Sequence, residues 1–521
     1  MTKDFAIGID LGTSTSEICV YKKGECFHIP EPAGDLNYLN PIMPSIVAIN
    51  PQGKLLVGKE ALGIVDTPGL GIKAVKREMG TGEKVILQGK EFRPEEISAL
   101  ILRQLKENAE KYLETTINEV VISVPANFPD AARQATLTAG KLAGLKVLRL
   151  INEPTAAALA FGIENIYVEE QLVVFDFGGG TLDITVLEMV AGVLDVKGSF
   201  GDSQLGGKDF DEKMIGLILG KFQANYPDAQ ITEKSRSAVK GVAEFAKKVL
   251  SSKDSHTVYL SNFIYRDGEF IDLDVEVTRQ EFEQAIAPLL ERAKECVRQV
   301  FNAIQIRPST TDRVLLVGGT TYIPAVRQLV YEMFNREPKA DINPDIAVSS
   351  GASINAAISQ DLISEESGII LIDVSPFGLG IEVVSQVGGQ QMLTYESLIS
   401  PNTTIPYSVK KEYSLMRADQ RQVEIKLYQD HKGDARFPRD AEDTGIVGYI
   451  TDIPPAANGI PYPVEVEFAY DTNGIATLKA SIPAIRKSVE ISYGKSASRM
   501  DEEDLTESIK RLDDLWLTRK G

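Results

Sequence analysis

Residues 172–189 read LVVFDFGGGTLDITVLEM, and this stretch decides the fold. An apolar run reaches Asp176, three glycines follow at 178–180, and a second apolar run resumes after Thr181 and Asp183. Apolar runs of this length, rich in β-branched and aromatic residues, predict buried strands, and glycines between them predict a turn. The stretch therefore predicts a β-hairpin with a carboxylate on each strand beside a glycine turn.

The same pattern occurs near the start of the chain. Residues 7–20, IGIDLGTSTSEICV, align without a gap on residues 173–186, VVFDFGGGTLDITV. The aligned pairs are Asp10 with Asp176, Gly12 with Gly178, Thr15 with Thr181, and Glu17 with Asp183. Internal similarity of this size predicts two similar lobes, each built around one such hairpin.

Two such hairpins that face each other suit the phosphate chain of a nucleotide. Glycines let backbone N–H groups approach phosphate oxygens closely, and hydroxyl side chains add donors. The aspartates would repel bare phosphate, so they favour a Mg²⁺ ion that keeps several waters between carboxylate and phosphate. The pair Gly318–Gly319, in VLLVGGTTYIP, again lies where a strand meets a helix. The alternative is an ordinary glycine turn in each hairpin, but the matched pair favours the nucleotide.

A different type of phosphate loop is excluded by the sequence. No GxxxxGK[ST] motif occurs in the chain, so it is not a Walker-type ATPase. The segment GTGEK at 80–84 has neither the spacing nor the hydroxyl of that motif, and we expect it to be a loop.

Composition restricts the class of protein. The 521 residues exceed what one core supports, so two or three domains are expected. The net charge of −19 argues against sequence-independent binding of nucleic acid, which needs a basic surface. Cys19, Cys26 and Cys296 are too few for a disulfide framework, and no Cys/His cluster indicates zinc. The chain has no apolar run that could span a membrane, and its start lacks the apolar region of a signal peptide, so we expect no membrane contact and a cytoplasmic location.

The pattern of predicted secondary structure changes twice along the chain. Up to about residue 360, strand-like and helix-like stretches alternate, which is typical of an α/β fold. From about residue 367, short alternating strands replace the helices, and Asn473–Gly474 indicates a hairpin turn. The last segment, MDEEDLTESIKRLDDLW, predicts an amphipathic helix with an acidic start that suits the helix dipole. Its apolar face consists of Leu505, Ile509, Leu512 and Trp516.

These features together resemble the heat shock protein 70 family of molecular chaperones. The family's motifs occur in the family's order: IGIDLGTSTS, VISVPANF, RLINEPTAAALAFG, FDFGGGTLDITVLE, GDSQLGGKDFDEKM, VLLVGGTTYIP, NPDIAV, LIDVSPFGLGIE and NTTIP. The resemblance implies an α/β fold with an actin-like, two-lobed ATPase domain at 1–366, an apolar linker at 367–373, an all-β peptide-binding sandwich at 374–494 and a truncated lid helix at 495–521. It implies a chaperone that binds extended apolar segments of unfolded polypeptides, with ATP binding and hydrolysis controlling peptide affinity.

The resemblance also implies which residues carry the chemistry. Lys76 of AVKR would position the attacking water, and Glu153 of NEPTAAA would activate or orient it. Asp10 and Asp176 would surround a hydrated Mg²⁺, with Thr181 beside the γ-phosphate of ATP. The implied cofactors are ATP or ADP and Mg²⁺, and K⁺ is compatible with them. Such chemistry depends mostly on positioning and charge stabilisation. Without the resemblance, the lysine would be taken for an exposed side chain and the glutamate for a helix-start residue.

The other implied nucleotide contacts come from the glycine turns, one helix and the adenosine side. They are Gly12, Thr13, Ser14, Thr15, Gly178, Gly179, Gly180, Asp183, Gly206, Gly207, Glu244, Lys247, Ser251, Gly318, Gly319, Thr320, Tyr322 and Asp345. Two of these depart from the family's pattern. Tyr322 stands where the family has an arginine that stacks on adenine, which predicts altered nucleotide affinity or release, and Thr15 replaces an asparagine.

In the β part, the resemblance implies a groove for an extended peptide. Its central pocket would be at Val423, and the residues lining or bridging it would be Ile381, Val384, Tyr413, Met416 and Ile425. Such a groove combines backbone hydrogen bonds with a pocket for one apolar side chain. From the residues alone, the alternative is that these side chains form the core of the sandwich, as alternating apolar positions normally do.

The resemblance further implies coupling between the two modules and two kinds of partner. The residues implied to relay between modules or to respond to a J-domain co-chaperone are Pro125, Arg133, Arg149, Asn152 and Asp373. A nucleotide exchange factor is the second implied partner. The chain is short between Gly80 and Pro94, where the family has a longer insert that exchange factors contact. This shortening resembles specialised bacterial paralogues of the HscC type.

Two other classes of protein stay open. A small-molecule kinase on the actin-like fold would share the phosphate hairpins, but it gives no reason for the apolar linker and the β module. A nucleotide-binding exchange factor without productive turnover would not need Lys76, Glu153 and Thr181. If the protein is a chaperone, the loss of most of the lid predicts quick binding and release of peptide in both nucleotide states.

Overall fold

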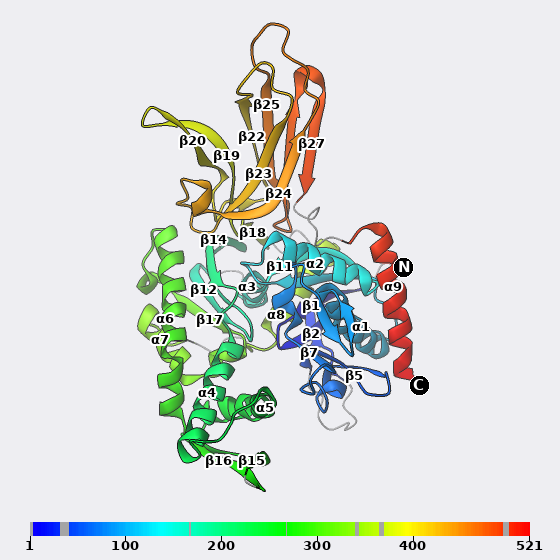
Figure 1. The fold of residues 1–521 in the computed structure, drawn as a ribbon, viewed down its shortest axis with the longest axis vertical. Helices are drawn as coiled ribbons and strands as arrows, with labels where there is room; N and C mark the ends of the chain where they lie inside the picture. The colour runs from blue at the N-terminus through cyan, green and yellow to red at the C-terminus, as the bar shows by residue number, and fades with distance from the viewer. Residues whose placement is uncertain are drawn as a thin grey trace.

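The computed structural model describes residues 4–31, 41–165, 168–266, 268–338, 343–363, 369–492 and 500–520. The chain forms two α/β lobes side by side, an all-β module above them, and a helix, α9, along the outer side of the first lobe (Figure 1). The predicted fold class is confirmed: α/β lobes come first, followed by a β-sandwich and a short C-terminal helix. Among the described residues, no helix is long and apolar enough to cross a membrane.

The first lobe is built on a mixed sheet with the strand order β11–β10–β1–β2–β3 and with β4 beside β2. Its strands are β1 (Phe5–Leu11), β2 (Thr15–Lys22), β3 (Glu25–His28), β4 (Met43–Pro44), β10 (Glu119–Val124) and β11 (Lys146–Asn152). Its helices are α1 (Pro94–Leu113), α2 (Asp130–Leu142), α3 (Glu153–Glu164) and α8 (Ala347–Ser359). Side chains of β1 alternate between two cores, because Ile7 and Ile9 pack with α1 and α2 whereas Ala6 packs with α3 and α8.

The second lobe repeats this layering. Its sheet has the order β17–β12–β13–β14–β18–β21. The strands are β12 (Glu170–Phe177), β13 (Leu182–Val190), β14 (Val193–Asp202), β17 (Arg313–Val317), β18 (Ile370–Val374) and β21 (Thr404–Ile405). The helices are α4 (Gly207–Asn225), α5 (Glu233–Leu250), α6 (Arg279–Ala303) and α7 (Pro324–Phe334). Phe175 and Phe177 face these helices, and Val174 shares a core with α3 and α8, which therefore lie between the two sheets.

Smaller sheets extend both lobes. They are formed by β5 (Ile46–Ile49), β6 (Leu55–Val57) and β7 (Gly71–Lys73), by β8 (Val85–Leu87) and β9 (Lys90–Phe92), and by β15 (Ser255–Arg266) and β16 (Glu269–Thr278). The segment 80–84 is a loop before β8, as predicted. The hairpin β15–β16 projects from the far end of the second lobe, opposite the β module (Figure 1).

The internal repeat is confirmed by the strand register. Strands β1 and β2 are antiparallel with Asp10 opposite Glu17, and β12 and β13 are antiparallel with Asp176 opposite Asp183. Each hairpin therefore carries two carboxylates as direct cross-strand neighbours, whose side chains lie on the same face. The repeat supplies one such pair to each lobe.

The apolar run predicted as a linker, 367–373, becomes part of a sheet. Residues 367 and 368 lie outside the described residues, and the rest leads into β18. Leu371 pairs with Leu194 of β14 in a parallel register, and Asp373 pairs with Ile405 of β21 in an antiparallel register. The run thus joins the sheet of the second lobe to the first residues of the β module.

The β module is a sandwich of two four-stranded sheets, with the orders β20–β19–β23–β24 and β22–β25–β26–β27. Its strands are β19 (Gly378–Val387), β20 (Gln390–Ile399), β22 (Tyr407–Ser414), β23 (Val423–Asp430), β24 (Glu442–Ile450), β25 (Pro463–Tyr470), β26 (Ala476–Ile482) and β27 (Lys487–Ser492). The predicted turn joins β25 to β26, with Gly474 at a φ of 68° that suits glycine. Phe468 and Leu478 meet between the sheets in one apolar core.

Helix α9 (Glu502–Leu517) confirms the predicted amphipathic helix and shows what its apolar face covers. Leu512 is completely buried against the core of the first lobe, beside α1 and α2. Arg103 of α1 pairs with Asp513 at 2.7 Å, and Arg93 pairs with Asp504 at 3.1 Å. The helix therefore packs on the first lobe and not over the β module.

Candidate functional site

The two glycine turns of the repeat touch each other across the lobes. A Cβ atom added to Gly179 would lie 2.0 Å from Oγ of Ser14, and one added to Gly180 would lie 2.5 Å from Oγ1 of Thr13. A side chain at either position would force Ser14 or Thr13 to shift, so glycine is what lets these turns approach each other this closely. Gly12 also leaves no room for a side chain, here within its own turn, since an added Cβ would lie 2.1 Å from the Thr15 carbonyl oxygen.

Two further predicted glycine pairs converge on the turn at 178–180. Gly207, the first residue of α4, donates its backbone N–H to the Gly178 carbonyl at 3.0 Å, and a Cβ on Gly206 would lie 2.5 Å from the Gly180 nitrogen. Gly318 has a φ of 81°, and a Cβ there would lie 2.5 Å from the Phe177 carbonyl oxygen. The next residues are Gly319, which has open space around it, and Thr320, whose hydroxyl donates to the Gly178 carbonyl at 2.8 Å.

A group of buried carboxylates lies beside these turns. Asp10 accepts a hydrogen bond from the Ser123 hydroxyl at 2.7 Å, and Asp183 accepts one from the Asn127 side chain at 2.7 Å. Burial raises the pKa of Asp183 to about 6. Burial, followed by the charges of its carboxylate neighbours, raises the pKa of Asp176 well above its ordinary value. The group therefore concentrates negative charge that burial makes unfavourable.

One lysine partly compensates this charge. The ammonium of Lys76 hydrogen bonds to the carboxylate of Glu153, and both side chains are almost completely buried. Burial raises the pKa of Glu153 to about 7, and the charge of Lys76 opposes that rise. A carboxyl group with such a pKa is suited to exchanging a proton near neutral pH. Thr181 is buried on the second glycine turn, where its carbonyl accepts a hydrogen bond from the Gly178 N–H at 3.0 Å.

The carboxylates fit a cation that keeps its water. Among the described residues, no three His, Cys, Asp or Glu side chains lie close enough together to bind a metal ion directly. The pKa values of Asp10 and Asp176 are nevertheless raised, chiefly by burial, and a nearby cation would relieve that effect. Mg²⁺ typically retains several waters and contacts few protein oxygens directly, so this set suits hydrated Mg²⁺.

The residues predicted for the adenosine side come from three elements. Lys247 of α5 donates to the Gly207 carbonyl at 3.0 Å and pairs with Asp211 at 2.8 Å, so it lies at the start of α4. Glu244, one turn earlier, pairs with Lys248. The remaining predicted residues here are Ser251, which follows the last residue of α5, and Tyr322, whose hydroxyl donates to Asp345 at 3.0 Å. The tyrosine that replaces the family's arginine is thus fixed to a second predicted residue.

A buried arginine connects the first lobe to the β module. Arg133 donates to the Asn152 side chain at 2.8 Å and to the Asn473 carbonyl, at the tip of the β25–β26 hairpin, at 3.0 Å. It also donates to the carbonyl of Pro125 at 3.5 Å. Asn152 donates in turn to Asp373 of β18 at 3.0 Å. Four of the five predicted coupling residues, all but Arg149, therefore belong to one hydrogen-bonded network from the hairpin tip to the apolar run.

Arg149 acts on this network through charge. Burial raises the pKa of Asp373, and the positive charges of Arg133 and Arg149 oppose that rise. Two contacts of the network were not anticipated from the sequence. The Asn473 side chain accepts a hydrogen bond from the Leu150 N–H at 2.9 Å, and Asp130 accepts one from the Ala476 N–H at 2.7 Å.

Only some of the site residues that the sequence analysis did not predict could have been found from the sequence. Ser123 lies in β10, which is parallel to β1, so its position beside Asp10 follows from strand order. Asn127 follows β10 and contacts Asp183 of the other lobe, which strand order does not predict. Nothing local indicated Asp130 or Asn473, because their partners belong to the other module.

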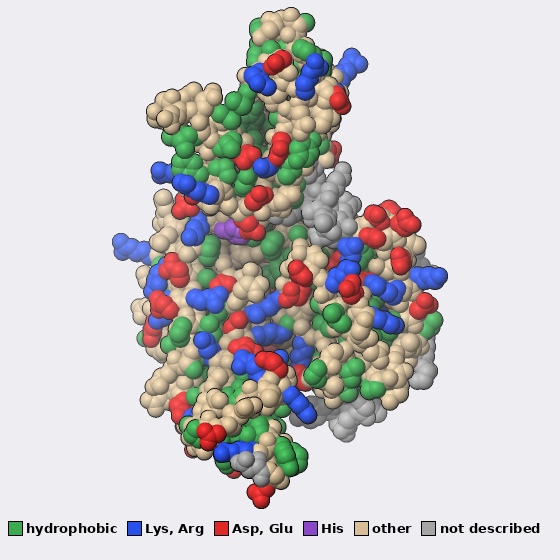
Figure 2. Space-filling view, viewed as in Figure 1, with side chains coloured by type: hydrophobic (Ala, Val, Ile, Leu, Met, Phe, Trp, Pro, Cys, Tyr) green, Lys and Arg blue, Asp and Glu red, His purple; other side chains and the backbone are tan. Residues whose placement is uncertain are grey.

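The predicted peptide groove residues divide into three pairs. Ile381 and Ile425 are buried in the sandwich core, Tyr413 and Val423 are half-buried against it, and Val384 and Met416 are 43% and 58% exposed. Other exposed apolar side chains on the β19–β20 arm are Met392 and Leu393. Figure 2 shows hydrophobic side chains gathered over this part of the β module. For the first pair, the sandwich-core alternative that the sequence left open fits better.

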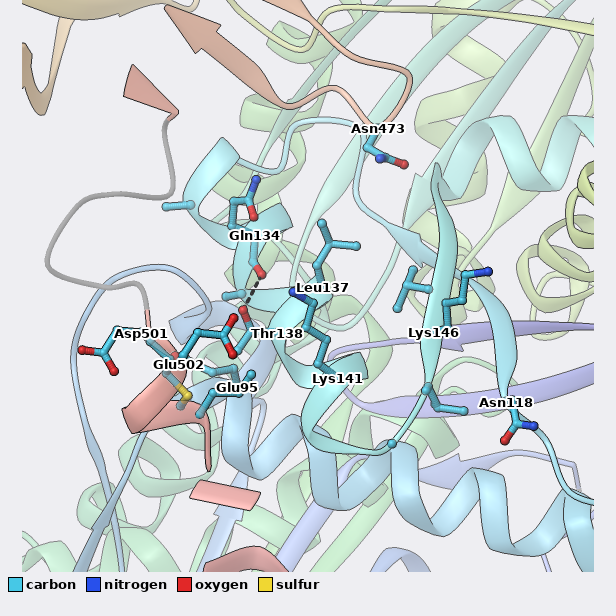
Figure 3. Close-up of a pocket in the computed structure, with 17 residues that line it drawn as sticks. Glu95, Asn118, Gln134, Leu137, Thr138, Lys141, Lys146, Asn473, Asp501 and Glu502 are labelled. Carbon is cyan, nitrogen blue, oxygen red and sulfur yellow. Dashed lines mark hydrogen bonds between the residues drawn. The ribbon is translucent and has the colours of Figure 1, made fainter. Parts of the chain in front are cut away.

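A cavity of about 650 Å³ lies elsewhere, where three parts of the chain meet. Gln134, Thr138 and Lys141 of α2 line one side, the hairpin tip at Asn473 closes the top, and Asp501 at the start of α9 lies opposite (Figure 3). Its lining contains none of the residues predicted to bind nucleotide or peptide. The cavity is therefore a space between modules and not the nucleotide site.

Comparison with known protein families gives one finding. A family model described as Hsp70 protein matches residues 81–514, which is most of the chain. The match includes the second glycine turn, the residues around Arg133 and the whole β module.

Proposed function

Because this chain belongs to the Hsp70 family, whose members are chaperones with ATPase activity, we propose that it hydrolyses ATP to ADP and phosphate and uses this cycle to control its affinity for extended apolar segments of unfolded polypeptides. We propose the domain division 1–366, 367–373, 374–494 and 495–521 for the ATPase domain, the linker, the peptide-binding sandwich and the lid helix. The observation that carries the proposal is the buried Lys76–Glu153 pair beside two facing glycine turns.

In the proposed reaction, the chain's own groups position the phosphates and one water. Backbone N–H groups and hydroxyls of the two turns, including Thr181, hold the phosphate chain from both lobes. Lys76 stabilises the developing negative charge, and Glu153 orients the attacking water and accepts its proton. Asp10 and Asp176 are the residues that would hold a hydrated Mg²⁺, which would supply positive charge to offset that of the phosphates. Catalysis would then come mainly from positioning in a water-poor site.

We propose that peptide affinity responds to nucleotide through the hydrogen-bonded network. The strand β18 belongs to the sheet that carries Asp176, and it leads directly into the β module. A change at the phosphates that moves the two lobes would also move Asn152 against Asp373, and with it the contact of Arg133 with the hairpin tip. Both ends of this network, at Asp373 and at the hairpin tip, would respond to the position of the lobes. A shared response of this kind is the physical requirement for coupling between the nucleotide site and the β module.

The proposed partners follow from the same surfaces. Exposed Val384, Leu393 and Met416 would contact an extended apolar polypeptide. A J-domain co-chaperone would act at the surface around Arg149 and Asp373, and an exchange factor on the outer ends of the lobes. We propose no nucleic-acid and no membrane partner, because the net charge of −19 opposes binding to phosphate backbones and anionic lipid. A reducing cytosolic location is supported by three cysteines, none of which forms a disulfide in the described part of the chain.

The experiment that tests the proposal is the dissociation rate of a fluorescent, extended, apolar peptide, measured with ADP and then with Mg-ATP. Faster release in Mg-ATP is the expected result. Lys76→Ala should remove hydrolysis, while Lys84→Ala, at an exposed lysine paired with Glu91 on the surface, should not. Peptide binding that is indifferent to nucleotide would contradict the proposed coupling.

The two alternative functions predict different experimental results for this protein. A small-molecule kinase would transfer phosphate to an added acceptor and show no peptide binding. An exchange factor without turnover would bind nucleotide, and Lys76→Ala would leave its phosphate release at the same low level as the unmodified chain.

A further inference from the structure

Two cysteines of the first lobe lie against each other under helix α8. Cys19 of β2 is completely buried, and Cys26 of β3 is half-buried. Both thiols contact the Ser353 hydroxyl, at 3.4 Å from Cys19 and 3.6 Å from Cys26. Cys26 also donates to the Ser350 carbonyl at 3.9 Å. The pair is therefore a dithiol held between two strands and one helix.

We propose that Cys19 and Cys26 form a modification site that a hydroperoxide oxidises to a disulfide, and that this bond weakens nucleotide binding by displacing α8. The first half of the inference concerns only the thiols. The second half rests on the proposed nucleotide site.

The chemistry begins at the accessible thiol. The sulfur of Cys26 attacks one oxygen of the hydroperoxide, an S–O bond forms, the O–O bond breaks, and water or an alcohol leaves, which gives a sulfenic acid. The sulfur of Cys19 then attacks the sulfur of Cys26, an S–S bond forms, and the S–O bond breaks. The hydroxyl leaves as water with the proton of Cys19. Two thiols thus supply the two electrons that reduce one hydroperoxide.

The order of these steps follows from exposure. Cys19 has no exposed surface, and burial raises the pKa of its thiol well above the usual range. Because the thiolate is the reactive form, Cys19 is a poor first target and acts as the resolving thiol. The neighbouring Cys26 thiol adds to that rise, so its oxidation removes one obstacle to the second step. We expect the disulfide to form slowly, over minutes to hours, since burial disfavours the thiolate of the resolving Cys19.

The strand register explains why the bond would have an effect. Cys19 lies opposite His28, and Tyr21 lies opposite Cys26, so the two cysteines are diagonal neighbours on one face. Diagonal neighbours start farther apart than the roughly 4 Å between Cβ atoms that a disulfide needs. Strand β3 must therefore shift towards Cys19. Among the described strands, β3 pairs only with β2, so its other edge leaves it free to move.

Helix α8 connects this shift to the nucleotide site. The helix backbone packs directly on β1, since a Cβ added to Gly8 would lie 2.0 Å from the Ser353 nitrogen. Two residues beyond Gly8 is Asp10, and one helical turn before Ser353 the Ser349 hydroxyl donates to Glu17, the cross-strand partner of Asp10, at 2.9 Å. Loss of the thiol contacts of Ser353 would disturb both the packing of α8 on β1 and the hydrogen bond from Ser349 to Glu17. An effect of about one hydrogen bond corresponds to roughly fivefold weaker nucleotide binding.

The test uses the full chain, reduced and then treated with hydrogen peroxide, followed by intact mass and peptide mapping without reductant. We expect a mass lower by two hydrogens, a cross-linked pair of peptides containing Cys19 and Cys26, and weaker ADP binding that a dithiol reductant restores. Cys296→Ser is the matched control, because Cys296 of α6 is buried in the other lobe and burial raises its pKa to about 12. It should still form the cross-link, and Cys26→Ser should not.

Three results would overturn the inference. Peroxide that adds only oxygen to Cys26, with no cross-link to Cys19, would refute the dithiol site. A cross-link with unchanged ADP affinity would refute the link through α8. In Cys19→Ala, a 1,3-dione probe should trap sulfenic acid at Cys26, and its absence would refute the order of steps. If the reduced chain bound no nucleotide at all, the proposed function would fail while the mass measurement still tested the thiols.

Discussion

The contact at the hairpin tip gives the sharpest prediction, for the substitution Asn473→Ala. Its side-chain oxygen accepts the Leu150 N–H at 2.9 Å, and this hydrogen bond joins the β module to the first lobe. The substitution removes that acceptor while the Asn473 carbonyl still accepts from Arg133. One neutral hydrogen bond contributes about 1 kcal/mol, and a donor left buried without a partner costs up to about 3 kcal/mol. The docking equilibrium of the two modules should therefore weaken by roughly 5- to 100-fold.

Two measurements check this magnitude. Hydrogen exchange of the Leu150 amide should accelerate by the same factor, since exchange requires the module to undock. The ratio of peptide dissociation rates in Mg-ATP and ADP should move towards one. Thr472→Ala is the matched control, because Thr472 is exposed in the same turn. If both variants exchange Leu150 equally fast, or if Asn473→Ala leaves the rate ratio unchanged, the hairpin tip does not couple the modules.

Further predictions concern the chemistry, the adenosine side, pH and the C-terminal helix. Thr181→Ala should slow single-turnover ATP hydrolysis by about 10²-fold and leave ADP binding intact, and unchanged turnover would refute its position beside the γ-phosphate. Tyr322→Arg should tighten ADP binding a few-fold, from about 0.5–1 kcal/mol of cation–π stacking on adenine, as measured by calorimetry. Burial raises the pKa of Asp130 from 3.8 to about 8, so the folded chain binds a proton there that the unfolded chain has released. Stability should therefore fall as pH rises between about 4 and 8, and Asp130→Asn should flatten that part of a urea-denaturation profile. Leu512→Ala should weaken the packing of α9 by about 2–5 kcal/mol, seen as a red shift of the fluorescence of Trp516, the only tryptophan.

The sequence predicted the two matched hairpins well because their information is local. The gapless alignment fixes which residues of the two hairpins correspond, and the period of two in a strand then fixes which face they share. The opposition of Asp10 to Glu17 and of Asp176 to Asp183 follows directly. The pairing of Lys76 with Glu153 could not be reached in this way, since the two residues lie 77 positions apart in different elements. The family resemblance implied that both residues act on the attacking water, but it did not predict their direct contact.

The β module shows where a pattern stops being informative. Alternation in β19 and β23 predicts that every second residue faces the other sheet, but it does not indicate which apolar face is covered. Ile381 and Ile425 lie inside, whereas Val384 and Met416 lie outside. The contacts of Asp130 and Asn473 were invisible for a related reason: an N-terminal helix residue and a turn residue have ordinary local roles, and their partners are hundreds of residues away.

Exposure of the apolar run 369–373 to water would be unfavourable, and the structure indicates how the chain limits it. An isolated apolar strand would expose both its side chains and its backbone groups, which is unfavourable on each count. Here β18 pairs with β14 of the second lobe on one side and with β21 of the β module on the other. The same residues therefore complete the sheet of the lobe and hold the module to it. Any motion that releases the β module must break these backbone pairs or carry β14 with it, so a shift of the lobe that holds Asp176 cannot leave the module unaffected.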